Sequence, residues 1–165
     1  MPHPPIGAPR GSRRPGLGCT SPVLGAVASI ASRYTLCVSE SPSLRLLIVD
    51  DDEANLRTFH RVFRTRFRLE LATSAERAME LLSAGGFDAV LSDFAMPGMN
   101  GVELLRFVQS AYPRMARLLV TGHADLPDVL EASAAGIADE VIAKPWDASG
   151  VVEQVGRAIE QASRR

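Results

Sequence analysis

The stretch "LLIVDDDEANL" at residues 46–56 places four apolar residues directly before three aspartates and a glutamate. A continuous apolar run of this length is typical of a parallel strand that is covered on both faces. The adjacent carboxylates of Asp50, Asp51 and Asp52 must repel one another, since two like charges ~4 Å apart cost about 4 kcal/mol at an effective dielectric constant of about 20. The sequence therefore predicts that a positively charged group lies at the end of this strand.

The overall composition favours one folded domain, because the chain has 165 residues and is 46% hydrophobic. Residues 45–165 carry 14 basic and 18 acidic side chains, so direct nucleic-acid binding is disfavoured as the main activity. The basic residues of the whole chain are 17 arginines and the single Lys144. A solitary lysine among arginines indicates a site that requires a compact ammonium group.

Residues 1–44 are rich in Pro, Gly, Ser and Arg, which predicts a disordered head before a folded domain at residues 45–163. A weak twin-arginine export pattern and a leader that is absent from the natural protein remain alternatives for this head. Both cysteines, Cys19 and Cys37, lie in the head, so no disulfide framework is expected in the domain and a reducing, cytoplasmic location is expected. No apolar stretch reaches the ~20 residues of a membrane helix.

From residue 44 onward, short apolar runs alternate with segments of helical periodicity. The continuous runs predict buried strands at 46–49, 89–91, 118–120 and 141–143, while the alternating "RLELA" at 68–72 predicts an edge strand. Between and after them, five segments repeat apolar residues at helical spacing. Strict alternation of strand and helix predicts an α/β fold with an open, doubly wound parallel sheet, in which function gathers beyond the carboxyl ends of the strands.

Polar residues follow four of these strands. They are Asp50 and Asp51 after the first, Asp93 after the third, Thr121 after the fourth and Lys144 after the fifth. The three carboxylates of Asp50, Asp51 and Asp93, which come from two neighbouring strands, form an oxygen-rich site that suits Mg²⁺, and the ion would offset their repulsion. A carboxylate can also attack phosphorus to give an acyl phosphate, and Asp93 is the candidate because it stands alone at its strand end. Lys144 and the Thr121 hydroxyl would then bind phosphoryl oxygens.

Four motifs, "LLIVDDDE", "LSDFAMPGMNG", "LLVTGHAD" and "AKPW", occur in an order and at spacings that resemble the receiver domain of two-component response regulators. The resemblance covers about residues 45–163. It implies a flavodoxin-like (βα)5 fold with strand order 2-1-3-4-5. By position it implies that Asp50 and Asp51 bind the metal, Asp93 accepts the phosphoryl group, Ala95 lends a backbone carbonyl to Mg²⁺, Thr121 is the switch hydroxyl, and Lys144 binds phosphate before the often cis Pro145.

The function implied by the resemblance is a signalling switch rather than an enzyme, with only self-catalysed phosphorylation and dephosphorylation. Asp93 would receive its phosphoryl group from a sensor histidine kinase, with Mg²⁺ as cofactor, and the modified protein would change its partners. An unknown downstream protein and a homodimer through the fourth helix, fifth strand and fifth helix are the expected partners, with neither nucleic acid nor membrane among them.

Four positions depart from the usual receiver pattern or vary within it. Val141 stands where receivers commonly carry an aromatic residue that follows the movement of the Thr. The resemblance therefore does not predict the route by which phosphorylation would reach a partner. Trp146 resembles a "KPW" subset that is often joined to phosphodiesterase or DNA-binding output domains. Ala95 and His123 occupy the two positions that often set the phosphoryl lifetime. Because Ala95 cannot orient a water molecule, slow self-dephosphorylation modulated by His123 is the hypothesis.

Two other functions remain as alternatives. The "VDDD" motif also fits a haloacid-dehalogenase-like phosphatase with Asp50 as nucleophile, although this interpretation leaves Asp93 unexplained. The second alternative is an inert receiver-like dimerisation module. Several further residues have structural explanations: Asp52 as a helix cap, His60 as a packing or surface residue, Met96, Pro97 and Met99 as loop packing, and Gly101 at a tight turn.

Overall fold

The computed structural model describes residues 44–165. The predictions about the head, which concern its disorder, its export pattern and its two cysteines, fall on residues 1–43 and lie outside the described residues. None of the helices in the described part is both long and apolar enough to cross a membrane.

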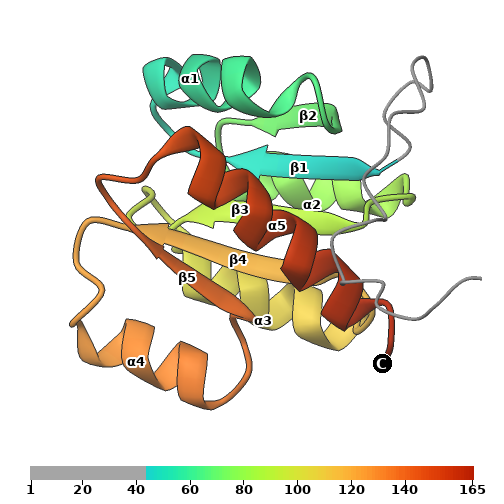
Figure 1. The fold of residues 1–165 in the computed structure, drawn as a ribbon. Coiled ribbons are helices and arrows are strands. Elements are labelled where there is room, and N and C mark those ends of the chain that lie inside the picture. Colours follow the sequence, from blue (N-terminus) through green and yellow to red (C-terminus); the bar gives the residue numbers. More distant parts are fainter. Residues whose placement is uncertain (1–43) are drawn as a thin grey trace, which may run out of the picture. The chain divides into compact units, whose positions relative to one another are not determined.

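The described chain alternates five strands with five helices (Figure 1). The strands are parallel and lie in the order β2-β1-β3-β4-β5, so the predicted fold class and strand order are confirmed. The alternating segment at 68–72 is β2, at one edge of the sheet, as its pattern predicted. The elements are β1 Arg45–Val49, α1 Glu53–Phe63, β2 Arg68–Ala72, α2 Ala75–Ser83, β3 Ala89–Asp93, α3 Gly101–Ala111, β4 Ala116–Thr121, α4 Pro127–Ala134, β5 Glu140–Ala143 and α5 Ala148–Ala162.

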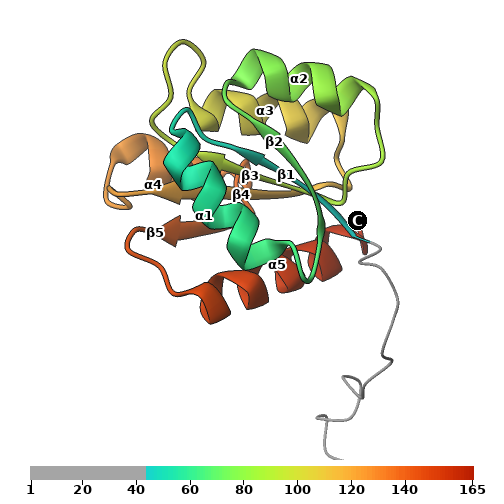
Figure 2. The same ribbon diagram turned by 90° about the horizontal axis from the view of Figure 1, so that it is seen from above.

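Two hydrophobic clusters, one on each face of the sheet, form the core. One cluster packs α2, α3 and α4 against Leu47 and Val49 of β1, and the other packs α1 and α5 against Leu46 and Ile48. Figure 2 shows α1 and α5 together on one side of the strands and α2 and α3 on the other. Both faces of β1 are therefore covered, which is why its sequence is a continuous apolar run.

The helices begin where the sequence provides polar caps. Asp52 precedes α1 and its carboxylate accepts a hydrogen bond from the backbone N–H of Ala54 at 2.7 Å, which confirms its predicted role as a cap. Ser74 caps α2 in the same manner. Asn100 and Glu103 form a reciprocal capping box at the start of α3. These caps fix where each helix leaves the carboxyl edge of the sheet.

The strand β4 is longer than its apolar run predicts, because it includes the charged Arg117. This side chain is only 3% exposed and donates to Asp139 at 2.9 Å, and the Asp139 side chain is equally buried. Arg165 also contacts the Asp139 carboxylate, at 2.5 Å. The ion pair joins the start of β4 to the residue before β5, so a charge is accommodated inside a buried strand.

Candidate functional site

The carboxyl ends of the five strands lie on the same side of the sheet (Figure 1). The register sets Asp93 of β3 opposite Val120 of β4, and Thr121 opposite Ala143 of β5. Asp50 follows β1 and Lys144 follows β5 directly. The predicted site residues at the strand ends therefore meet at one edge, where ligands bind in open parallel sheets.

The Lys144 ammonium group lies between two carboxylates. Its Nζ atom donates a hydrogen bond to Oδ1 of Asp93 and lies 3.9 Å from Oδ2 of Asp50. The two carboxyl side chains are buried, whereas the lysine side chain is 32% exposed. The positive group that the sequence predicted at the end of the first strand is therefore present, and it comes from the chain's single lysine.

The Asp50 carboxylate is only partly satisfied. Its Oδ1 atom accepts hydrogen bonds from the backbone N–H of Asp52 at 2.9 Å and from the Asn55 side chain at 3.0 Å. Its Oδ2 atom is buried and has no hydrogen-bonding partner in the described part of the chain. Burial raises the pKa of Asp50, and the Asp93 charge raises it further, while the two hydrogen bonds and Lys144 act in the opposite direction.

This donor set fits a hard divalent cation. A buried carboxylate oxygen without a partner is stabilised by a nearby positive charge, and carboxylate and carbonyl oxygens are the ligands that Mg²⁺ prefers. Within residues 44–165, no three acidic, histidine or cysteine side chains lie close enough to form a metal cage. The side chains brought together are those of Asp50 and Asp93, while Asp51 is exposed. Mg²⁺ commonly takes one or two carboxylates and keeps several waters, so a complete cage is not required.

The Asp93 carboxylate is held by its own loop. Its Oδ2 atom accepts a hydrogen bond from the backbone N–H of Ala95 at 3.0 Å. Gly101 begins α3, after the predicted turn, and its N–H donates to the Phe94 carbonyl at 3.0 Å. A Cβ atom at Gly101 would lie 2.2 Å from the Asp93 carbonyl oxygen, so only glycine permits this approach of α3 to β3.

Met96 is buried in the core cluster and Met99 packs against it, as predicted for this loop, whereas Pro97 is exposed. His60 is also exposed, on α1, which agrees with the surface alternative for that residue.

Thr121 and Lys144 lie on adjacent strands at this edge. The Thr121 side chain is 2% exposed, and its hydroxyl oxygen accepts a hydrogen bond from the backbone N–H of His123 at 3.0 Å, which leaves its proton for another acceptor. The Thr121 carbonyl accepts from the Lys144 backbone N–H at 2.8 Å. The Lys144–Pro145 peptide bond is cis, as the resemblance implied.

The residue after Pro145 connects the site to α1. The Trp146 ring stacks on Phe59 of α1 with centroids 4.8 Å apart and an angle of 18° between the rings. Phe59 in turn contacts Phe63. Val141, in β5, is half-buried and packs against the core cluster that includes α4. The aromatic ring nearest to Lys144 in the sequence, that of Trp146, therefore packs against α1.

Sequence reasoning missed Asn55 and explained only part of the role of Gly101, and both residues shape this edge. The Asn55 side chain donates a hydrogen bond to Asp50. The only indication of this in the sequence was its position in the first turn of the helix that follows the acidic run. Gly101 was expected only at a turn, whereas its main effect is to let α3 approach the backbone of Asp93.

Comparisons with known proteins agree with this arrangement. The model of the response regulator receiver domain matches residues 46–156. Chemotaxis protein CheY of Pseudomonas aeruginosa is 31% identical over 128 residues, which cover 73% of this chain and 99% of CheY. The crystal structure of a CheY-like receiver domain protein from Methanospirillum hungatei has a TM-score of 0.68 at 30% identity, covering 73% of this chain and 97% of that one.

A longer relative matches over the same region. The hydrogenase transcriptional regulatory protein HoxA of Cupriavidus necator is 32% identical over 116 residues, which are 70% of this chain but 24% of HoxA. The chain thus spans about a quarter of the length of that regulator. The match to the family model and the nearly complete match to CheY show that the chain belongs to the response regulator receiver domain family.

Proposed function

We propose that this protein is a phosphorylation-dependent switch of a two-component system, which accepts a phosphoryl group on Asp93 from a sensor histidine kinase. One observation carries the proposal: the Lys144 ammonium group contacts the Asp93 carboxylate and lies near the unpartnered oxygen of Asp50. A nucleophilic carboxylate, a cation for the incoming phosphate and an acidic position for a metal are therefore next to one another.

In the proposed reaction, a carboxylate oxygen of Asp93 attacks the phosphorus of a phosphohistidine, the O–P bond forms and the P–N bond breaks. Lys144 would exchange its contact with the carboxylate for one with a phosphoryl oxygen, and the Thr121 hydroxyl would donate to another. Asp50, Asp51, Asp93 and the Ala95 carbonyl would hold Mg²⁺, which would neutralise part of the phosphoryl charge. The cytoplasm, where thiols stay reduced, is the proposed location.

The two alternative functions receive less support. A phosphatase that uses Asp50 as nucleophile would need an accessible carboxylate, but Asp50 is 1% exposed and one of its oxygens already accepts two hydrogen bonds. An inert dimerisation module would have no use for a buried carboxylate oxygen without a partner or for a lysine held between two acidic groups.

Mass measurement after incubation with acetyl phosphate and Mg²⁺ tests the proposal. We expect the protein to gain the mass of one phosphoryl group, with the modified peptide containing Asp93. Asp93→Asn should abolish the gain, whereas Asp50→Asn should retain some of it because its nucleophile is intact. An adduct on Asp50 would support the phosphatase, and the absence of any adduct would favour the inert module.

The lifetime of the phosphoryl group gives a second test. Ala95 carries only a methyl group and His123 is exposed beside Thr121, so we expect slow loss of the phosphoryl group and a changed rate in His123→Ala. Quantifying the phosphorylated fraction over time on a phosphate-affinity gel measures both rates. A half-life of seconds that is the same in both proteins would contradict this hypothesis.

The proposed output surface includes α4, β5 and α5, through which a phosphorylated homodimer or a downstream protein would bind. Leu130 of α4 is 57% exposed, more than any other large apolar side chain within residues 44–165. An exposed leucine on this helix supports a protein contact there.

A further inference from the structure

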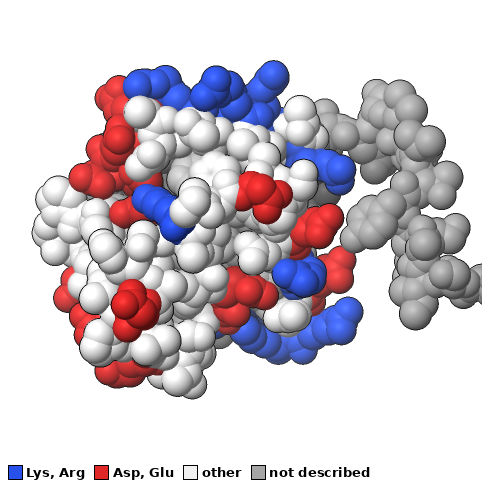
Figure 3. Space-filling model, turned by 60° about the vertical axis from the view of Figure 1, so that its left-hand side comes forward, with Lys and Arg blue, Asp and Glu red and all other residues white. Residues whose placement is uncertain are grey.

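The outward face of α1 carries a row of basic side chains. The row occupies the i, i+3, i+4 and i+7 positions, so its members lie on one side of the helix. It consists of Arg57, His60, Arg61 and Arg64, and all four are exposed. Figure 3 shows arginine or lysine side chains gathered along the top of the molecule, where α1 lies in Figure 1. This row stands out because acidic residues outnumber basic ones over residues 45–165.

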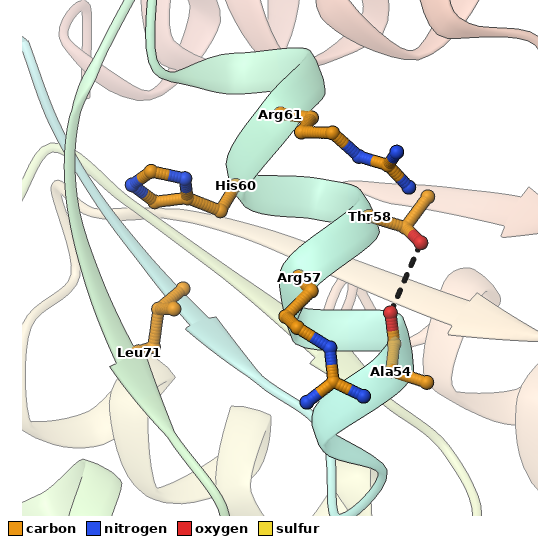
Figure 4. A pocket seen from close by; sticks show the side chains of 6 residues that line it. All are labelled: Ala54, Arg57, Thr58, His60, Arg61 and Leu71. Atoms are coloured by element: carbon orange, nitrogen blue, oxygen red, sulfur yellow. Dashed lines mark hydrogen bonds between the residues drawn. The ribbon is translucent and has the colours of Figure 1, made fainter.

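A shallow hollow accompanies this row. It has a volume of about 590 Å³ and is lined by Ala54, Arg57, Thr58, His60, Arg61 and Leu71, which we call the α1 groove. In Figure 4, His60 projects from α1 toward the strand that carries Leu71, whereas Arg61 extends away from it. Leu71 lies on the edge strand β2 and is 36% exposed. The α1 groove therefore combines cations with an exposed apolar side chain.

The cations of the α1 groove are poorly neutralised. Among the described residues, Arg57 has one acidic partner, Glu53 at 3.3 Å, and their side chains are 69% and 77% exposed. Exposed pairs of this kind contribute little to stability and exchange easily with another carboxylate. Arg61 has no acidic partner within residues 44–165. Both guanidinium groups remain available to an incoming anion.

We propose that the α1 groove binds an acidic segment of a partner protein, with carboxylates on Arg57 and Arg61 and an apolar side chain against Leu71. Guanidinium groups pair with carboxylates through two parallel hydrogen bonds, and the apolar contact adds affinity that a purely electrostatic site lacks. This inference goes beyond the proposed function and does not depend on phosphorylation of Asp93.

Charge argues against two other occupants. Residues 1–43 carry four arginines and one glutamate, so that segment would be repelled by the α1 groove. A nucleic-acid strand following the helix would meet Asp51, Asp52 and Glu53 at and just before the start of α1, and phosphates gain nothing from Leu71. A short acidic protein segment can reach both arginines without extending to the acidic start of α1.

Binding of a fluorescein-labelled peptide, with glutamate and leucine at helical spacing, tests the proposal by fluorescence anisotropy. We expect the double variant Arg57→Glu/Arg61→Glu to weaken binding by about tenfold or more and added salt to weaken binding to the wild type. Leu71→Ser should weaken binding without changing its salt dependence. The matched control is Arg106→Glu/Arg114→Glu, which changes the net charge equally but alters α3 and the turn after it, on the other face of the sheet.

Three results would overturn the proposal. The first is equal loss of peptide binding in the two double variants. The second is tighter binding of a single-stranded DNA oligomer than of the peptide. The third is self-association of the wild type that the Arg57→Glu/Arg61→Glu variant abolishes, which would make a second copy the occupant. Circular dichroism establishes that each variant is folded. The acetyl phosphate adduct, measured on the same variants, reports separately on the proposed function.

Discussion

The Asp50 carboxylate is the residue whose environment most directly calls for a cation. It is buried, it lies near Asp93, and one of its oxygens has no partner within residues 44–165. Its pKa is raised above the ordinary 3.8, chiefly by burial, so ionisation costs more in the folded state than in the unfolded state. Its favourable contribution to folding is therefore complete below pH 3.8 and is lost as the pH rises through the raised pKa.

We predict that Asp50→Asn stabilises the metal-free protein near neutral pH by about 1–3 kcal/mol, because it removes a buried charge while an amide oxygen can still accept from Asn55 and Asp52. The gain should disappear below pH 3.8, where Asp50 itself is protonated. Urea unfolding in the presence of a chelator measures both values.

Adding Mg²⁺ provides the control for this prediction. The ion should raise the urea midpoint of the wild type and have little effect on Asp50→Asn, because binding to the native state alone stabilises it. A loss of stability in Asp50→Asn at neutral pH without metal would contradict the proposed cost of this charge.

The proximity of Asp50, Asp93, Thr121 and Lys144 could be predicted because each stands at the end of a largely apolar strand, and parallel strands bring such ends together. Asn55 could not, because an asparagine in the first turn of a helix has the same pattern whether it faces water or a buried carboxylate. Gly101 was noticed but not understood, since what it contacts is set by how closely α3 approaches β3.

The start of α3 depends on a close approach to β3 that tolerates no side chain at Gly101. A methyl group there would also lie 2.9 Å from Leu119 of β4, in addition to its clash with the Asp93 carbonyl. Because the clash involves backbone that belongs to the proposed phosphoacceptor, displacing α3 would also displace Asp93.

We predict that Gly101→Ala destabilises the protein by about 3 kcal/mol and slows phosphorylation by acetyl phosphate. Gly156→Ala is the matched control, because its methyl group on α5 would meet no atom within 4 Å. That variant should gain about 0.5–1 kcal/mol from the higher helix propensity of alanine. Chemical unfolding of both variants measures the difference, and equal stability would show that α3 can move without cost.

The length of β4 illustrates a limit of reasoning from apolar runs. The sequence places Arg117 before "LLV", and a charged residue ordinarily marks the end of a buried strand. Its partner Asp139 is 22 positions away, and no local pattern reveals that pairing. The existence and order of the strands followed from periodicity, while this boundary depended on a contact between distant segments.

The sheet exposes different surfaces at its two edges, and α4 lies beside the β5 edge. Leu130 on α4 and Leu71 on β2 are both exposed leucines, but only Leu130 belongs to the proposed α4–β5–α5 interface. The two positions allow the same substitution to be compared at opposite edges of the domain.

We predict that phosphorylation increases dimer formation, that Leu130→Glu abolishes the increase and that Leu71→Glu leaves it intact. A charge in the middle of an apolar contact is desolvated without a partner, which disfavours association. Light scattering coupled to size exclusion, before and after treatment with acetyl phosphate, measures the oligomeric state. Dimerisation of phosphorylated Leu130→Glu would exclude α4 from the interface.

The stacking of Trp146 on Phe59 has a practical consequence for kinetic work. The chain has a single tryptophan, and it lies two positions from the lysine that would contact the phosphoryl group. Its indole emission is therefore an intrinsic optical probe of the loop, assignable to one residue without any dye. Stopped-flow fluorimetry on the unaltered chain should follow the arrival and departure of the phosphoryl group in real time.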